Sequence, residues 1–175
     1  MCNMETYKID LLALEGDVTT YNFHLSDAFF EEIQAPEIKH GNLDVDLRVK
    51  KVSNMFEIDF HTQGVVSIPC DICLEDMEQP IDTKDSLVVR LGVVNEEDED
   101  DEIVTVDREQ GIFDASWYIY EFIILSIPIK HVHEEGQCNP EMLKMFHDHQ
   151  VSDQDGQAKP IDSRWQELLK IKDKD

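Results

Sequence analysis

Alternation of apolar and polar residues is the clearest pattern in this chain. Every second residue from Leu43 to Val49 is apolar and the residues between them are charged, and the same alternation runs from Phe56 to Phe60. A period of two with one polar face indicates antiparallel strands with one face packed against the core and the other exposed to solvent. Residues 53–54, Ser-Asn, predict the turn between these two strands.

Further strands are predicted on both sides of this pair. Residues 7–14 and 18–25 have strand character and are separated by Gly16, which predicts an opening hairpin. Three more segments have the composition of strands, namely residues 65–69, which follow Gly64 and lead into Cys70, residues 85–94, and more weakly residues 102–107.

Helices are predicted in four places. Residues 28–33 follow two N-capping residues, and residues 141–147 form a short candidate. Residues 115–127 are apolar on nearly all sides, which predicts a long helix buried across the packed face of the sheet. Residues 162–170 predict an amphipathic C-terminal helix.

These elements predict an α+β fold. We expect an antiparallel sheet of about six to eight strands, either a meander or a partly closed barrel, packed by the long buried helix. Residues 1–138 are expected to form one α+β domain that contains the Cys-x2-Cys turn. Residues 139–175 are expected to form a polar connector followed by the short C-terminal helix.

The charge of the chain restricts its partners. The sequence holds 39 acidic and 15 basic side chains, a formal net charge of -24. Such a field repels nucleic acid phosphates and anionic lipid, so a basic protein is a more suitable partner than naked nucleic acid. The acidic run at residues 96–102 predicts a solvent-exposed loop. The alternatives are that it attracts a basic partner or that it weakly binds a divalent cation.

The sequence also predicts a cytoplasmic protein. No stretch approaches the roughly 20 apolar residues of a membrane helix, and the N-terminus lacks the basic and apolar regions of a signal peptide. The four cysteines of such a chain are expected to be reduced thiols.

The candidate chemistry lies in two cysteine motifs. Cys70 and Cys73 form a C-x2-C pair after a predicted strand, and His133 and Cys138 form H-x4-C after the predicted long helix. Together they offer the Cys3His donor set that structural zinc accepts, with His131 as a competing imidazole. The alternative is that the thiols are unligated and lie in the core or at the surface.

A redox dithiol is the other interpretation of Cys70 and Cys73. Asp71, Glu75 and Asp76 crowd the pair and are expected to raise the thiol pKa, which disfavours redox catalysis. The sequence holds no Gly-rich phosphate loop, G-x-S-x-G turn or H-E-x-x-H helix. We therefore name no catalytic residue.

The motifs occur in an order that resembles a known family. Cys70-x-x-Cys73-Leu74-Glu75, the apolar segment ending in Leu125-Ser126-Ile127-Pro128, His133-x4-Cys138 and Asp162-x-Arg164-Trp165-x-x-Leu168 follow one another between about Val65 and the C-terminus. This order resembles the YceD-like large ribosomal RNA subunit accumulation proteins of bacteria and plastids.

The resemblance implies a small acidic cytoplasmic protein that large-subunit ribosomal RNA needs in order to accumulate, without a known enzymatic activity. The family gene often neighbours one for a small basic zinc-ribbon protein of the large subunit, in keeping with a basic partner. Family members carry either His or Cys at the later ligand position, as interchangeable metal ligands would allow. They commonly have Arg between the first two cysteines, where this chain has Asp71 and Ile72, so no role of that Arg carries over.

Two function classes follow. The first is a non-catalytic ribosome biogenesis factor that binds a basic ribosomal protein or a large-subunit precursor. The second is a zinc-dependent enzyme that acts on RNA or a small molecule through an open zinc position near Cys70, His133 and Cys138. The absence of catalytic motifs and the family resemblance favour the first class.

Overall fold

The computed structural model describes residues 4–93 and 103–149. Contacts divide the chain into two compact units, Met1–Asn139 and Pro140–Asp175. In the first unit lie all the described strands, the 3-10 turn η1 (Met4–Tyr7) and the helices α1 (Asp27–Glu32) and α2 (Ser116–Ser126). In the second lies α3 (Pro140–His149).

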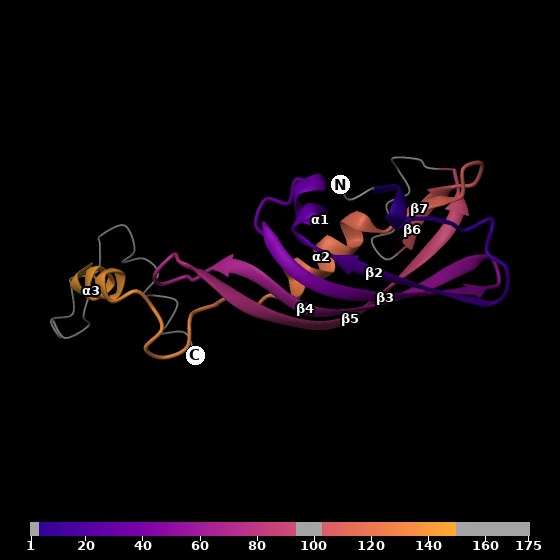
Figure 1. Ribbon diagram of the computed structural model, residues 1–175. Coiled ribbons are helices and arrows are strands. Elements are labelled where there is room, and N and C mark those ends of the chain that lie inside the picture. Colours follow the sequence, from indigo (N-terminus) through magenta and orange to yellow (C-terminus); the bar gives the residue numbers. More distant parts are fainter. Residues whose placement is uncertain (1–3, 94–102, 150–175) are drawn as a thin grey trace, which may run out of the picture. The chain divides into compact units, whose positions relative to one another are not determined.

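The main sheet of the first unit has five strands in the order β2-β3-β4-β5-β6 (Figure 1). Their bounds are β2 Val18–Leu25, β3 His40–Val52, β4 Met55–Pro69, β5 Asp76–Gly92 and β6 Ile103–Asp107. The strands β2 to β5 pair antiparallel with their neighbours, whereas β6 runs parallel to β5. The sheet is open, with β2 at one edge and β6 at the other.

The predicted fold class was therefore wrong. The protein is mostly β, its main sheet is mixed rather than antiparallel, and it has short helices instead of one long buried helix. The direction of β6 explains the mixed sheet. The strand β6 starts with Ile103 beside Val88 and runs in the same direction as β5.

The predicted alternation on β3 and β4 was confirmed. The apolar residues from Leu43 to Val49 and from Phe56 to Phe60 are all buried, and the intervening side chains are exposed or half-buried. The two strands meet at residues 53–54, as the turn signal predicted. This packed face of the sheet forms the core with α1 and α2.

The strand β4 is longer than the sequence pattern indicated, because it continues through Gly64 to Pro69. Gly64 has φ +149, and a Cβ at this position would lie 2.2 Å from the carbonyl oxygen of Asn42. Only glycine therefore lets β3 and β4 stay paired here. The paired strands carry the chain directly to Cys70.

The predicted opening hairpin was wrong. The strand β1 (Lys8–Asp10) pairs with β7 (Ile112–Asp114) in a separate two-stranded sheet, and β2 pairs with β3. The side chain of Asp10 ends β1, since its Oδ1 accepts hydrogen bonds from the N–H groups of Leu12 and Ala13 at 2.9 and 3.1 Å. This turn bends the chain away from its own next strand.

The prediction of a long, largely buried helix at residues 115–127 was also wrong. The helix α2 has 11 residues and packs against β4 and β5 with one face, which includes the buried side chains of Ile119 and Ile123. Its other face leaves Trp117 54% and Leu125 72% exposed. The sheet covers one side of the helix, and no other described element covers the opposite side.

The remaining helices lie close to their predicted positions. The helix α1 buries Phe29 and Phe30, and α3 begins one residue before the predicted segment 141–147 and ends two residues after it. The predicted C-terminal helix at residues 162–170 lies outside the described residues. Within the described part of the chain, no helix combines the length and apolar character that crossing a membrane requires.

Candidate metal centre

The first half of the site is the turn that joins β4 to β5. The N–H of Cys70 donates to the carbonyl oxygen of Glu75, and the N–H of Leu74 donates to that of Cys70, both at 2.9 Å. Leu74 has φ +60, the left-handed conformation that lets the chain reverse here. The turn directs the thiols of Cys70 and Cys73 inward, where these residues are 0% and 2% exposed.

The second half of the site is the segment that follows α2, and hydrogen bonds tie it to the turn. The N–H of Asp71 donates to the carbonyl oxygen of His131 at 3.0 Å, and the N–H of His131 donates to Asp71 Oδ2 at 2.8 Å. Farther along, Asn139 Nδ2 donates to Glu75 Oε1 at 2.7 Å. Sequence reasoning missed this positioning role of Asp71 and Glu75, because it considered only the effect of their charge on the thiols.

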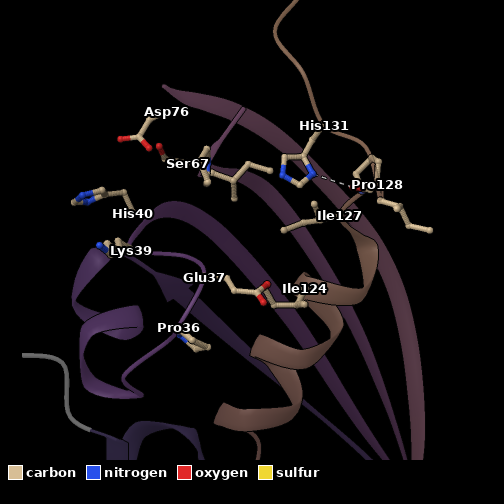
Figure 2. A pocket seen from close by; sticks show the side chains of 13 residues that line it. Pro36, Glu37, Lys39, His40, Ser67, Asp76, Ile124, Ile127, Pro128 and His131 are labelled. Carbon is tan, nitrogen blue, oxygen red and sulfur yellow. Dashed lines mark hydrogen bonds between the residues drawn. The ribbon is translucent and has the colours of Figure 1, made fainter. Parts of the chain in front are cut away.

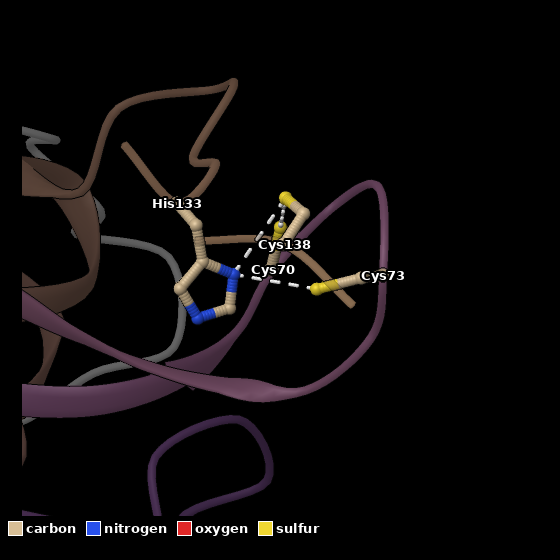
Figure 3. Close-up of side chains that lie close together, drawn as sticks. All are labelled: Cys70, Cys73, His133 and Cys138. Carbon is tan, nitrogen blue, oxygen red and sulfur yellow. Dashed lines mark hydrogen bonds between the residues drawn. The ribbon is translucent and has the colours of Figure 1, made fainter. Parts of the chain in front are cut away.

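The structure brings the four predicted ligand residues together (Figure 3). Their donor atoms lie within 4.8 Å of one another. Cys70 Sγ lies 3.8 Å from Cys138 Sγ, and His133 Nδ1 lies 3.3 Å from Cys73 Sγ and 3.8 Å from Cys138 Sγ.

These distances suit a tetrahedral zinc ion. With Zn–S near 2.3 Å and Zn–N near 2.0 Å, neighbouring sulfur ligands lie about 3.8 Å apart and a sulfur lies about 3.5 Å from a nitrogen. The observed separations between Sγ and Nδ1 fall on either side of the second value. The donor set fits zinc in geometry and in chemistry, and the binding of a metal at these residues stays a prediction.

The same distances exclude disulfides within the cluster. Cys70, Cys73 and Cys138 are free, and the 3.8 Å between Cys70 Sγ and Cys138 Sγ far exceeds the roughly 2.05 Å of an S–S bond. The cluster holds three separate thiols, as a metal site requires.

His131, the competing imidazole, does not join the cluster. Its Nδ1 lies 3.0 Å from the carbonyl oxygen of Pro128, and its Nε2 lies 3.4 Å from Asp71 Oδ1. Both ring nitrogens therefore have partners, and His131 contributes to the contact between the two halves of the site.

The thiol of Cys70 is more acidic than the sequence predicted. Burial has the largest influence and raises its pKa, but hydrogen bonds from the backbone N–H groups of Cys73, His133 and Ile72 and from the His133 side chain together lower that pKa to about 6. The expectation that acidic neighbours would raise the pKa was wrong for this thiol. The nearby backbone dipoles point their positive ends at the sulfur, which favours the thiolate.

The pKa values of His133 and Cys138 are both raised, and Cys138 holds a proton that a metal must displace. A hydrogen bond with the Cys70 thiol raises the pKa of His133, while burial and hydrogen bonds with Cys70 and Cys73 raise the pKa of Cys138 to about 11. In the metal-free protein at pH 7, Cys70 is mainly a thiolate and Cys138 a thiol.

We therefore expect zinc affinity to rise with pH. Zinc binds neutral imidazole and thiolate, so binding at neutral pH releases at least the proton of Cys138. One released proton makes the affinity about tenfold higher per pH unit while the pH stays below the pKa of about 11 of Cys138. Competition with a chromophoric chelator at about pH 6.5, 7 and 7.5 measures this slope. A pH-independent affinity would contradict the assignment of Cys138 as a ligand.

The low pKa of Cys70 removes the argument that acidic neighbours would raise its pKa and so disfavour redox catalysis. The redox interpretation nevertheless has less support than the metal interpretation. A dithiol that exchanges with a substrate must be reached by that substrate. Cys70 and Cys73 are both buried, and His133 and Cys138 lie against them.

A cavity of 760 Å³ lies between the end of α2 and the strands β3 and β4 (Figure 2). Its lining includes the apolar side chains of Ile124 and Ile127 and the imidazoles of His40 and His131. His40 Nδ1 lies 3.0 Å from Asp27 Oδ2, and His131 contacts Pro128. These two imidazoles are therefore each held by a neighbour.

Comparison with known proteins gives one match. The model of a family described as "Large ribosomal RNA subunit accumulation protein YceD" matches residues 58–172. This range begins in β4 and includes all four cluster residues. No curated protein and no solved structure matches the chain.

Proposed function

Because the chain belongs to the YceD family of large ribosomal RNA subunit accumulation proteins, we propose that it is a non-catalytic factor of large-subunit biogenesis. In this proposal the protein binds a basic ribosomal protein or a large-subunit precursor particle, and a structural zinc ion holds the Cys3His cluster together. The Cys3His cluster inside the matched range is the observation that carries the proposal.

The charge distribution supports a basic partner. The chain has a net charge of -24. On the solvent-exposed face of the main sheet, the basic side chains have acidic neighbours. Lys50 Nζ lies 2.9 Å from Glu57 Oε2, and Arg48 is paired across the strands with Asp59. Such a surface attracts a cationic protein more readily than a phosphate backbone.

The donor set supports a structural role for the metal. Catalytic zinc sites keep one position open for water or substrate, whereas structural sites fill all four positions with protein ligands. Here Cys70, Cys73, His133 and Cys138 supply four donors, and the turn that carries the first two is buried. A zinc ion held by all four would have no open position, which weighs against the zinc-dependent enzyme.

A pull-down at two salt concentrations tests the proposal. We expect the tagged protein to recover large-subunit proteins from a cell extract at about 0.05 M salt and at least about tenfold less of them at about 0.5 M, because salt screens exposed charges. An unrelated protein of similar size and net charge is the control. Recovery of no large-subunit components at low salt would overturn the proposed function.

A further inference from the structure

The strand β5 has a long edge that no described strand pairs with. Residues Asp76–Arg90 of β5 pair with β4, but only Val88–Gly92 pairs with β6. Among the described residues, no strand pairs with the other edge of β5 from Asp76 to Leu87. Figure 1 shows β5 along the border of the sheet, with β4 on its inner side.

The register identifies the backbone groups that face this edge. Cys70 and Glu75 form a hydrogen-bonded pair, and because hydrogen-bonded pairs alternate along an antiparallel ladder, the odd-numbered residues of β5 bond to β4. The even-numbered residues therefore direct their N–H and C=O groups away from β4. Consistent with this, the carbonyl oxygen of Gly92 accepts a hydrogen bond from the N–H of Arg108, on the β6 side.

Pro80 divides the edge into two parts. Proline has no N–H to donate, and the carbonyl oxygen of Pro80 already accepts a hydrogen bond from Gln79 Nε2 at 3.1 Å. Beyond Pro80, the outward N–H and C=O groups belong to Asp82, Lys84 and Ser86. These residues form an edge segment that can pair with another strand.

The side chains along this edge are mainly acidic. Asp76, Glu78 and Asp82 are exposed, with Lys84 as the basic residue among the outward-facing positions from 76 to 86. A hydrogen bond with His61 lowers the pKa of Asp82, so this carboxylate remains charged. Like charges on paired strands are destabilising and opposite charges are favourable. The edge therefore disfavours a second copy of itself and favours a cationic strand.

We propose that the edge of β5 at Asp82, Lys84 and Ser86 binds an extended, lysine- or arginine-rich segment of a partner protein as an additional strand. The backbone of the segment pairs with β5, and its cationic side chains lie beside Asp82 and Glu78. This inference rests on the proposed function, since it names the surface that a basic partner would use. Strand addition of this kind derives affinity from main-chain hydrogen bonds.

A matched pair of peptides tests the inference with the zinc-loaded full chain. The probe is a synthetic peptide of about ten alternating lysines and valines, long enough for one strand. Its control carries the same charges but has N-methyl groups on every backbone nitrogen, so neither of its edges can donate the pairing hydrogen bonds. We expect the unmethylated peptide to bind at least about tenfold more tightly. Equal affinities would show attraction by charge alone and overturn the inference.

A matched pair of variants makes the same test on the protein side. Lys84→Pro and Lys84→Ala both remove the charge, but only proline also removes the outward N–H. We expect Lys84→Ala to bind the peptide at least as tightly as the natural protein, and Lys84→Pro about tenfold more weakly than Lys84→Ala. Amide hydrogen exchange of Asp82, Lys84 and Ser86 in the natural protein should slow when the peptide binds. If exchange at these amides does not change in the bound state, the partner lies elsewhere.

Sedimentation of the free protein tests the competing occupant. If a second copy covered the edge, the protein would be a dimer that Lys84→Pro dissociates and Lys84→Ala preserves, and that result would overturn the inference.

The failure of this inference can be distinguished from the failure of the proposed function. A pull-down that recovers large-subunit proteins equally with Lys84→Pro and Lys84→Ala would leave the proposed function intact and reject this surface.

Discussion

Replacing Cys70 with serine is expected to abolish stoichiometric zinc binding. If about 10–16 kcal/mol of apparent zinc affinity is shared among four ligands, each ligand accounts for about 2.5–4 kcal/mol, a roughly hundredfold to thousandfold loss of affinity. Zinc content by elemental analysis should fall from about one ion per chain to near zero. Added zinc should raise the unfolding temperature of the natural protein but not that of the variant.

The two histidines of the same segment provide the matched control. His133 Nδ1 lies in the cluster, whereas His131 contacts Pro128 and Asp71. We expect His133→Asn to lose zinc as Cys70→Ser does, and His131→Asn to retain it. Equal zinc content in the two histidine variants would contradict the assignment of the fourth ligand. A Cys70→Ser protein that keeps its zinc would contradict the whole site.

Replacing Gly64 with alanine is expected to lower the free energy of unfolding by about 3–5 kcal/mol. The new Cβ would lie 2.2 Å from the carbonyl oxygen of Asn42 and 2.6 Å from Cα of Leu43, so backbone atoms of β3 would have to move. A φ of +149 adds strain for any residue with a side chain. Urea denaturation measures the change, with an unchanged m-value as evidence that the same structure unfolds.

Gly16→Ala is the control for this second prediction. Gly16 also has a positive φ, +101, but no atom lies within 4 Å of the position that a Cβ would take. We expect this substitution to cost only about 1 kcal/mol, from backbone strain without a clash. If both variants lost the same free energy, the close pairing of β3 and β4 at Gly64 would not be the cause.

The turn at Cys70 links these two predictions. Gly64 lets β4 stay paired with β3 up to Ser67, while β4 stays paired with β5 up to Pro69, and Cys70 follows directly. The β4–β5 ladder therefore delivers two thiols to one point, where the segment after α2 adds His133 and Cys138. A bound metal would fix the end of the strand whose free edge we propose as the partner surface.

The sequence identified the candidate ligands, but it could not choose among their environments. Spacing and residue type alone identified Cys70, Cys73, His133 and Cys138 as candidate ligands, because thiols and imidazole are the donors that zinc prefers. Charge alone then suggested that acidic neighbours raise the thiol pKa. The folded chain directs backbone N–H groups and the His133 side chain at Cys70, and their hydrogen bonds outweigh the effect of burial on its pKa.

The errors in the predicted fold have a common cause. The partner of β1, the direction of β6 and the exposed face of α2 all depend on residues far away in the sequence. Ile9 pairs with Phe113, across more than half the chain, and no local pattern reports such a pairing. The apolar composition of α2 could not show that only one of its sides is covered.

The sequence by itself determined the two alternating strands, the donor types of the cluster and the strong negative charge, because periodicity and composition are local properties. Only the tertiary structure decided that His133 rather than His131 faces the thiols, that the pKa of Cys70 is low, and that no described strand pairs with one edge of β5 from Asp76 to Leu87. Each of these features arises where separate segments meet, and the energy of such contacts depends on positions that no single segment specifies.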